Sequence, residues 1–459
     1  MKTIIKSGTI VTGSDVMKAD LVLEDGKIVS IAFEADVSEQ DEVIDADGRL
    51  VFPGGIDVHT HLAWPSGNLY TADDFVTGTK AAAIGGITSI INFATGGARR
   101  SLIDSLHEWK RKAAEAVIDY GFHSVIVECN EELLEELPVL AEREGVTSIK
   151  LFMAYKGELM VTDADMFKLM KKAGQSGMLT NVHAENGDLI DELIAEALSQ
   201  SNTAPIYHAY TRPPSIESEA TGRAIAIAEL AGAPLYIVHV SCAEALERIA
   251  EAKLRSSRIY AETCPHYLVL DQSELERPGF EGGKYVCSPP LREKWNQQAL
   301  WKGIESGLIS TVGSDHCPFR FEGQKSLGRN NFANIPNGVP GIEDMFSLLY
   351  HYGVHEGRIP LTKFAEIIAS GPARLFGLHP VKGSIRVGAD ADLVLLDPKR
   401  TRTITQAAQQ QNLDYNLYEG TEVHGVITHV LSRGELIAHE GRFVGSLGRG
   451  RYLHRRKFG

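Results

Sequence analysis

Two histidines one residue apart, His59 and His61, are the side chains with the clearest capacity for chemistry. Side chains alternate between the two faces of a β-strand, so residues i and i+2 point the same way and can present two imidazoles to one ion. The pair follows a short stretch that starts at Pro53-Gly54-Gly55, which predicts a strand entered from a turn. The pair is therefore a candidate half of a metal site. A His-x-His alone is equally typical of a surface pair, so the rest of the chain must decide.

The chain has 459 residues, of which 43% are hydrophobic and 23% are charged. This length exceeds the roughly 250–300 residues at which a single core stops growing, so we expect two structural units in a globular protein. The formal net charge of −14 leaves no basic field for a phosphate backbone and argues against nucleic acid as the partner. Only residues 454–457 are locally basic, and we interpret them as a solvated or subunit-contacting tail.

The five cysteines are odd in number, widely spaced and form no Cys-x-x-Cys unit. A disulfide framework is therefore not expected. No stretch approaches the roughly 18 apolar residues of a membrane span, and Lys6 interrupts the apolar start of the chain. We expect no membrane contact and a reducing, cytoplasmic location.

Both ends of the chain are patterned as short strands and tight turns. The strand-like segments are 21–24, 27–31, 391–396, 426–431 and 436–444. Asp25-Gly26, between the first two of them, supplies the positive φ angles of a type I′ hairpin turn. We predict one small β-sandwich domain assembled from residues 1–52 and 377–459, which includes a C-terminal tail.

Between these ends, apolar β-type runs alternate with helical patterns. The eight runs are 56–61, 88–93, 123–127, 148–152, 179–183, 235–239, 258–262 and 310–315. Eight such alternations favour a parallel (β/α)8 TIM barrel over residues 53–376. Asn186 is a candidate N-cap for the helix after the fifth run. Residues 241–244 have the Ser-x-x-Glu spacing of a capping box for the helix after the sixth.

The polar residues at the ends of these runs form one constellation, because a barrel gathers the C-terminal ends of its strands around one mouth. They are His59, His61, Lys150, His183, His239 and Asp315. Imidazole and carboxylate are ligands that borderline divalent cations such as Zn²⁺ prefer. Six ligands are too many for one tetrahedral site and indicate two metals about 3.5–4 Å apart. Taken singly, each residue has an ordinary structural explanation, such as a core histidine or a helix cap, and their common position is what favours the metal site.

Lys150 is the unusual member of the set, since an ammonium beside two cations is repelled. Burial and nearby positive charge both depress a lysine pKa and leave a neutral, nucleophilic amine. Such an amine can take up carbon dioxide and become a carbamate, a carboxylate-like bridge between two metals. The hypothesis for Lys150 is therefore a carboxylated lysine.

Several ordered motifs resemble the amidohydrolase superfamily and, within it, the cyclic amidases of the hydantoinase and dihydropyrimidinase family. They are GGIDVHTH at 54–61, KLFMAYK at 150–156, VHAENG at 182–187, VHVS at 238–241, ETCPHYL at 262–268, SPPLR at 288–292, GSDHCPF at 313–319 and IPNG at 335–338. The resemblance covers essentially the whole chain. It implies hydrolysis of a hydantoin or 5,6-dihydropyrimidine ring to an N-carbamoyl amino acid.

The resemblance also implies a ligand set for two divalent ions, zinc first and manganese or cobalt next. His59, His61 and Asp315 would hold the buried ion, and His183 and His239 the exposed one. Carboxylated Lys150 would bridge the two ions, and a hydroxide shared by them would attack the ring carbonyl.

Four side chains would complete the reaction by this resemblance. Tyr155 would hydrogen-bond the carbonyl oxygen as it becomes an oxyanion. Asp315 would take the proton of the hydroxide and pass it to the leaving ring nitrogen. Ser288 and Asn337 would hold the ring amide, although on sequence alone Ser-Pro-Pro is also ordinary turn sequence.

The sequence departs from the family pattern where substrate specificity is expected. Ala63 stands where relatives that process substituted hydantoins usually carry an acidic residue, and Ser66 where a phenylalanine is common. At the end of the second run, Asn92 replaces a common aspartate. The metal machinery is retained while the loop over residues 63–70 has changed.

Three other functions are alternatives for a sequence of this kind. Dihydroorotase is disfavoured because Ala63 occupies the place of the arginine that would bind the substrate carboxylate. An allantoinase-type ring hydrolase would use the same metal chemistry. A non-catalytic scaffold like the collapsin response mediators would have lost ligands that are all present here. The C-terminal segment from Asp414 to Leu453 resembles one used in subunit contacts, so a homotetramer or homodimer is expected.

Overall fold

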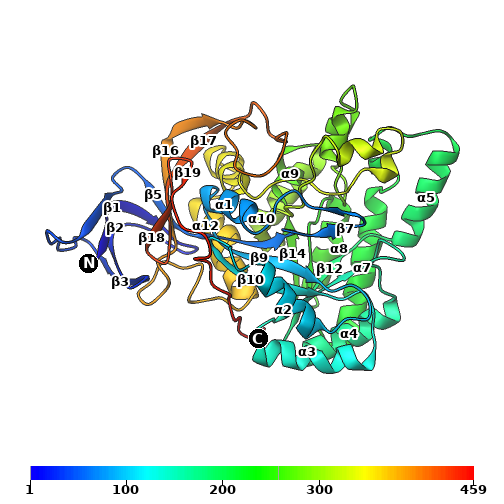
Figure 1. Ribbon diagram of the computed structural model, residues 1–459, viewed down its shortest axis with the longest axis horizontal. Helices are drawn as coiled ribbons and strands as arrows, with labels where there is room; N and C mark the ends of the chain where they lie inside the picture. The colour runs from blue at the N-terminus through cyan, green and yellow to red at the C-terminus, as the bar shows by residue number, and fades with distance from the viewer. Residues whose placement is uncertain (1, 257, 459) are drawn as a thin grey trace.

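A computed structural model describes residues 2–256 and 258–458. The two ends of the chain form a β-sheet domain on one side, and the intervening chain forms a barrel with helices around it (Figure 1). In these residues no helix is long and apolar enough to cross a membrane.

Eight parallel strands form the barrel. They are β6 (Gly55–Thr60), β9 (Ile87–Thr95), β10 (Asp119–Val125), β11 (Ser148–Phe152), β12 (Leu179–His183), β13 (Leu235–Ile237), β14 (Ile259–Thr263) and β15 (Thr311–Val312). Each strand pairs with the next in chain order. A parallel bridge between Thr60 and His316 brings the first strand to the end of the last. The predicted barrel is therefore confirmed, with one strand at each of the eight predicted runs.

Helices alternate with these strands and cover the barrel. They are α1 (Thr77–Ile84), α2 (Leu102–Lys112), α3 (Glu131–Arg143), α4 (Asp163–Gln175), α5 (Gly187–Ser199), α6 (Tyr207–Tyr210), α7 (Pro214–Ala231), α8 (Ala243–Lys253), α9 (Pro265–Val269), α10 (Trp295–Ser306), α11 (Met345–Leu349), α12 (Leu361–Ala365) and α13 (Gly371–Leu375). Short 3-10 turns are η1 (Gln272–Glu276), η2 (Glu281–Tyr285), η3 (Lys325–Gly328) and η4 (Phe332–Asn334), and π-helical turns are η5 (Tyr350–His355) and η6 (Glu366–Ser370).

The two predicted helix starts have different outcomes. Asn186 caps α5 as predicted, because its side chain accepts a hydrogen bond from the Leu189 backbone N–H. The capping box at residues 241–244 is wrong. Cys242 is the N-cap of α8 and makes no side-chain cap, because the Ser241 hydroxyl donates instead to the buried carboxylate of Glu217.

The terminal domain is one nine-stranded sheet. Its strands are β1 (Thr3–Val11), β2 (Val16–Glu24), β3 (Lys27–Ala32), β4 (Glu42–Asp45), β5 (Leu50–Pro53), β16 (Leu393–Thr403), β17 (Glu422–Ser432), β18 (Glu435–His439) and β19 (Arg442–Phe443). Antiparallel pairing of β5 with β16 joins the two ends of the chain. The predicted β domain from both termini is confirmed, with its strands hydrogen-bonded into a single continuous sheet. The boundaries 1–52 plus 377–459, against 53–376, remain our proposed division.

The C-terminal tail departs at one residue from the interpretation of residues 454–457 as a solvated or subunit-contacting end. His454, Arg456 and Lys457 are exposed, whereas Arg455 is buried. Strand β10 pairs with β11 only at its last two residues, Ser124 and Val125, which leaves the first part of β10 free to pair with another segment. The tail enters there, and Arg455 is only 1% exposed. Its guanidinium donates to Ser148 Oγ at 2.9 Å and to the Phe122 carbonyl. The basic side chain therefore satisfies backbone inside the fold.

A buried ion cluster joins the barrel to the terminal domain. The Lys382 ammonium lies 2.5 Å from Asp119 Oδ2 on β10, 2.7 Å from Asp392 and 2.9 Å from Asp390. Burial lowers the pKa of Lys382, but the three carboxylates outweigh burial and raise it above its usual value. Arg433, from the turn after β17, also pairs with Asp119. The cluster stays charged because each ion has opposite charges within hydrogen-bonding distance.

Replacing Lys382 with methionine removes the ammonium that contacts Asp392 and one of the two cations that contact Asp119 and Asp390. We expect Lys382→Met to lower the free energy of unfolding by about 3–5 kcal/mol, as for other buried ion pairs that lose one partner. Thermal and urea unfolding measure the change. Lys27→Met is the matched control, since Lys27 meets Asp390 from a largely exposed position and should cost about 1 kcal/mol or less. Equal losses in the two variants would contradict the account of the cluster.

Candidate metal centre

All nine residues singled out from the sequence line one cleft of about 1010 Å³ at the C-terminal ends of the barrel strands. They are His59, His61, Lys150, Tyr155, His183, His239, Ser288, Asp315 and Asn337. Sequence positions up to 278 residues apart are brought together because successive parallel strands deliver their ends to the same mouth.

One group of ligand atoms converges on Asp315. His59 Nε2 lies 3.0 Å and His61 Nε2 3.2 Å from the same carboxylate oxygen, Asp315 Oδ1. Burial lowers the pKa of His61 to about 4, which leaves a neutral imidazole. Burial raises the pKa of Asp315, but the two imidazoles outweigh it and hold the pKa well below its usual range. A neutral imidazole beside an ionised carboxylate is a donor set suited to a divalent cation.

The second group consists of His183 and His239. Their facing atoms, His183 Nδ1 and His239 Nε2, are 2.9 Å apart. Burial lowers the pKa of His239 well below its usual value. Glu185 Oε2 lies 2.8 Å from His183 Nε2 and holds the ring proton there, so His183 Nδ1 presents a lone pair. A cation between the two facing nitrogens would satisfy both, and this donor set therefore fits a metal ion.

The two groups adjoin, and Lys150 lies among them. The ring centroids of His59 and His239 are 5.4 Å apart. Lys150 is 1% exposed, and its ammonium nitrogen lies 4.9 Å from the ring centres of Phe93 and of Phe152. Burial lowers the pKa of Lys150 to about 7. An amine that is neutral for a substantial fraction of the time at pH 7 is compatible with carbamate formation.

Two buried carboxylates orient the histidines from behind, and the sequence analysis assigned neither a role. Glu262 Oε1 lies 2.5 Å from His59 Nδ1, while its other oxygen accepts a hydrogen bond of 2.8 Å from the Tyr236 hydroxyl. Glu185 makes the equivalent contact to His183. Carboxylates of this kind fix the imidazole tautomer and raise its basicity as a ligand. Glu185 could have been found by the i, i+2 spacing that drew attention to His59 and His61.

An aromatic ring forms the floor beneath the ligands. Phe93, on β9, stacks on His61 at 5.0 Å on one side and on His123 at 4.7 Å on the other. His123 Nε2 donates to the Val58 carbonyl at 2.9 Å, and its Nδ1 contacts Ser148 Oγ at 2.6 Å. Since Ser148 also accepts from the tail, a polar chain runs from the C-terminus to the backbone just before His59.

The backbone is strained where it presents several of these side chains. The φ angles of His239, Asp315, Tyr155 and Ala63 are positive, at 40°, 48°, 66° and 53°. Non-glycine residues adopt this region at an energetic cost, and such residues concentrate at functional sites. The strand ends therefore turn sharply at the mouth and aim their side chains into the cleft.

Asn92, on β9, forms hydrogen bonds through both the oxygen and the nitrogen of its side-chain amide. Its side-chain oxygen accepts hydrogen bonds from Thr60 Oγ1 at 2.9 Å and from the Leu62 backbone N–H at 2.8 Å. Its amide nitrogen donates to the Phe93 carbonyl at 3.0 Å. A carboxylate could not make the last bond, so the amide is fully used in holding the loop after the paired histidines.

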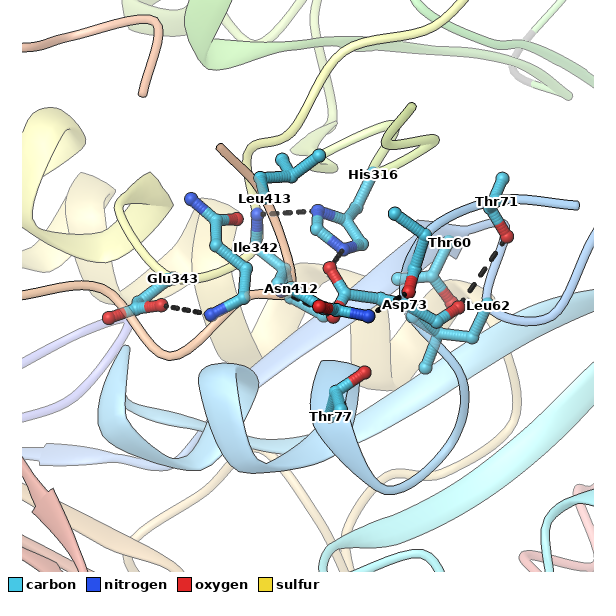
Figure 2. A network of polar contacts seen from close by, with 12 residues as sticks. Thr60, Leu62, Thr71, Asp73, Thr77, His316, Ile342, Glu343, Asn412 and Leu413 are labelled. Carbon is cyan, nitrogen blue, oxygen red and sulfur yellow. Dashed lines mark hydrogen bonds and ion pairs between the residues drawn. The ribbon is translucent and has the colours of Figure 1, made fainter. Parts of the chain in front are cut away.

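A segment of the terminal domain between β16 and β17 forms hydrogen bonds with the loops at the mouth of the barrel (Figure 2). Asp73 Oδ2 lies 3.1 Å from His316 Nε2, next to the ligand Asp315, and Asp73 Oδ1 accepts from the Asn412 backbone N–H at 2.9 Å. His316 Nδ1 accepts from the Gly341 N–H at 3.2 Å, so Nε2 carries the proton given to Asp73. This network ties the last barrel strand to the terminal domain.

The remaining predicted residues form one wall of the cleft. Tyr155 lies beside Ser288, and burial raises its phenol pKa above the usual value. Asn337 lines the same cleft. Strands β7 (Pro65–Ser66) and β8 (Leu69–Tyr70) form a small antiparallel hairpin that also lines the cleft. This hairpin contains the part of the loop whose sequence departs from the family pattern.

A barrel with four imidazoles, a carboxylate and a buried lysine at its mouth has the architecture of a metal-dependent hydrolase. Comparison with known proteins agrees. The family model described as Amidohydrolase family matches residues 50–437. The D-hydantoinase of Geobacillus stearothermophilus is 52% identical over 100% of this chain and 98% of its own length. The D-hydantoinase of Ralstonia pickettii is 48% identical over 100% of both chains.

A solved structure is similar to this chain over its whole length. The crystal structure of dihydropyrimidinase from Brevibacillus agri NCHU1002 has a TM-score of 0.98 and 52% identity, and the match covers 100% of both chains. The chain belongs to the amidohydrolase family, in its hydantoinase branch. Its reaction class is the hydrolysis of a cyclic amide, and the family implies a binuclear divalent metal site.

Glu262 provides a test of the orienting carboxylates. We expect Glu262→Gln to weaken binding of the ion held by His59 by about 10- to 100-fold, because a neutral amide is a poorer partner for the imidazole N–H. Competition with a chelator measures the affinity of each ion. The exposed Glu142, which pairs with Lys457 at the surface, supplies the control Glu142→Gln. Unchanged affinity in Glu262→Gln would contradict the assigned role.

Proposed function

We propose that this protein is a D-hydantoinase of the dihydropyrimidinase type, which opens a hydantoin or dihydropyrimidine ring to an N-carbamoyl amino acid. The observation that carries the proposal is the convergence of four histidines, Asp315 and buried Lys150 in one cleft. The preference for the D form rests on the names of two relatives that are 48–52% identical to this chain.

We assign two divalent ions to the cleft, with zinc first and manganese or cobalt as alternatives. His59, His61 and Asp315 would hold the buried ion, which their convergence within 3.2 Å supports. His183 and His239 would hold the second. When bound, the two cations would lower the pKa of a water molecule between them and supply the nucleophile for the ring carbonyl.

Lys150 would bridge the ions as a carbamate formed with carbon dioxide. Its burial and its place between the two histidine groups support this assignment. The carbamate would place negative charge where an ammonium would repel the cations. It would also reduce the positive charge of the loaded site, because four neutral imidazoles and one carboxylate offset only one of the four charges of two divalent ions.

The chain's own side chains would carry the proton and the oxyanion. Asp315 would accept the proton of the attacking water and deliver it to the ring nitrogen as the C–N bond breaks. Tyr155 would donate its phenolic hydrogen to the carbonyl oxygen as negative charge develops there. A raised phenol pKa supports this role, because the hydroxyl stays protonated at neutral pH.

Ser288 and Asn337 would hold the ring amide on the wall that carries Tyr155. Their backbone groups, the Ser288 hydroxyl and the Asn337 side-chain amide offer both donors and acceptors, as a ring with alternating N–H and C=O groups requires. The hairpin of β7 and β8 would contact the exocyclic substituent. Because that hairpin differs from the family pattern at Ser66, the preferred substituent is to be measured with a series of 5-substituted rings.

The expected setting is the cytoplasm, with the protein as a homotetramer or homodimer. The resemblance of the C-terminal segment to one used in subunit contacts supports assembly. Light scattering that reported a monomer would contradict it.

A substrate comparison tests the function. The metal-loaded enzyme is incubated with hydantoin, dihydrouracil, D- and L-5-substituted hydantoins and allantoin, and kcat/KM is compared. The proposal predicts the highest values for D-5-substituted hydantoins or dihydrouracil. Allantoin as the best substrate would establish the allantoinase alternative, and activity on none of them would overturn the substrate class.

Removing the proposed Lys150 carbamate should abolish activity, and an added carboxylic acid should restore part of it. We expect Lys150→Ala to abolish activity, with partial recovery on adding short carboxylic acids that occupy the vacated bridging position. Activity and metal content are measured with and without acetate or propionate. Lys156→Ala, at an exposed lysine of the following loop, is the control. Full activity of Lys150→Ala without added acid would contradict the bridging role.

A further inference from the structure

Lys325 is a second buried lysine near the cleft, outside the metal ligands and without an assigned role. It begins the 3-10 turn η3 and is 0% exposed. Among the described residues, its ammonium has no carboxylate within ion-pair distance. Burying an amine without a counter-ion is unfavourable unless its N–H groups are hydrogen-bonded, so its contacts indicate what it stabilises.

Those contacts are two backbone carbonyls from different loops. Lys325 Nζ donates to the Val286 carbonyl at 2.8 Å and to the Pro336 carbonyl at 3.3 Å. The Val286 carbonyl also accepts from the Gly338 backbone N–H at 3.1 Å. The side chain of Lys325 therefore bridges the two loops beside a direct backbone hydrogen bond between them.

The bridged carbonyls lie one or two residues before the two residues proposed to hold the substrate ring. Val286 is two residues before Ser288, and Pro336 is one residue before Asn337. Ser288, Pro336 and Asn337 line the cleft, whereas Lys325 does not. The separation of the two substrate-binding residues therefore depends on a group behind the wall.

The bridge does not require a particular protonation state. Burial lowers the pKa of Lys325 to about 7, and nearby thiols only partly offset this effect. An ammonium has three N–H donors and a neutral amine has two, so both hydrogen bonds to the carbonyls persist in either form.

We propose that Lys325 is a positioning residue for substrate, which sets the spacing of Ser288 and Asn337 by clamping the loops that carry them. The inference deepens the proposed function and rests on its assignment of these two residues to the ring amide. Lys325 touches no metal ligand, so its loss acts on substrate binding and leaves the metal ions in place. The effect falls on KM more than on kcat, because the ring amide contacts form on binding and persist through the reaction.

The test compares three variants of the full-length, metal-loaded protein. Lys325→Met fills the space without donors, and Lys325→Gln keeps one amide group too short to span both carbonyls. Lys382→Met removes a third buried lysine, at the junction of the barrel with the terminal domain, and is the control for lost stability. KM and kcat for the best cyclic amide, metal content and Tm are measured for each, at a temperature where all are folded.

We expect Lys325→Met to raise KM by about 10- to 100-fold, as displacements of about 1 Å in a binding site do. Lys325→Gln should lie between it and the wild type, with two ions per chain in both. Lys382→Met should lower Tm and leave KM unchanged. If Lys325→Met does not fold, Lys325→Gln alone decides, by a KM that is raised or equal to that of the wild type.

The outcomes separate the two levels of the proposal. A wild type that hydrolyses cyclic amides while the Lys325 variants keep its KM would overturn the positioning role and leave the proposed function intact. A KM shift matched in size by Lys382→Met would assign Lys325 to stability alone and also overturn it. A wild type that hydrolyses no cyclic amide would overturn the proposed function itself.

Discussion

The structure depends on holding several electron-rich ligand atoms close together in a buried cleft. Asp315 Oδ1 has two imidazole nitrogens within 3.2 Å, and two further imidazoles face each other at 2.9 Å. The scaffold holds two of these rings, His59 and His183, from behind, so that their other ring nitrogens face the centre of the site. Glu262 and Glu185 do so through the ring nitrogens that point away from the centre. The barrel, the strained strand ends and the ring of Phe93 packed beneath the ligands also fix the positions of the ligand side chains.

The terminal sheet domain also helps to hold the barrel and its ligand residues in place. The segment after β16 reaches the mouth at Asp73, and the tail packs into the barrel through Arg455. The Lys382 cluster joins the two domains at Asp119, the first residue of β10. The mouth and base are thus both fastened by chain that follows the barrel in sequence. This arrangement explains why the two ends of a long chain pair with each other, since the sheet they form anchors all three attachments.

Much of this could be predicted from the sequence, for physical reasons. The eight β runs and the ligands at their ends follow from strand periodicity and from the single mouth of a barrel, and the Asp25-Gly26 hairpin follows from turn chemistry. Long-range polar partnerships could not be predicted this way. Ser241 has the spacing of a cap, yet it binds Glu217 from a neighbouring helix. Arg455 has the composition of a solvated tail, yet its partners Ser148 and Phe122 lie some 300 residues earlier.

The central claim is that the cleft holds two divalent ions bridged by a carboxylated Lys150. Anomalous diffraction from crystals of the metal-loaded protein, with metal analysis of the same sample, tests it most directly. The account predicts two ions per chain, one among His59, His61 and Asp315 and one between His183 and His239, with carbamate density on Lys150 reaching both. A single ion per chain, or two ions flanking an unmodified Lys150, would contradict it.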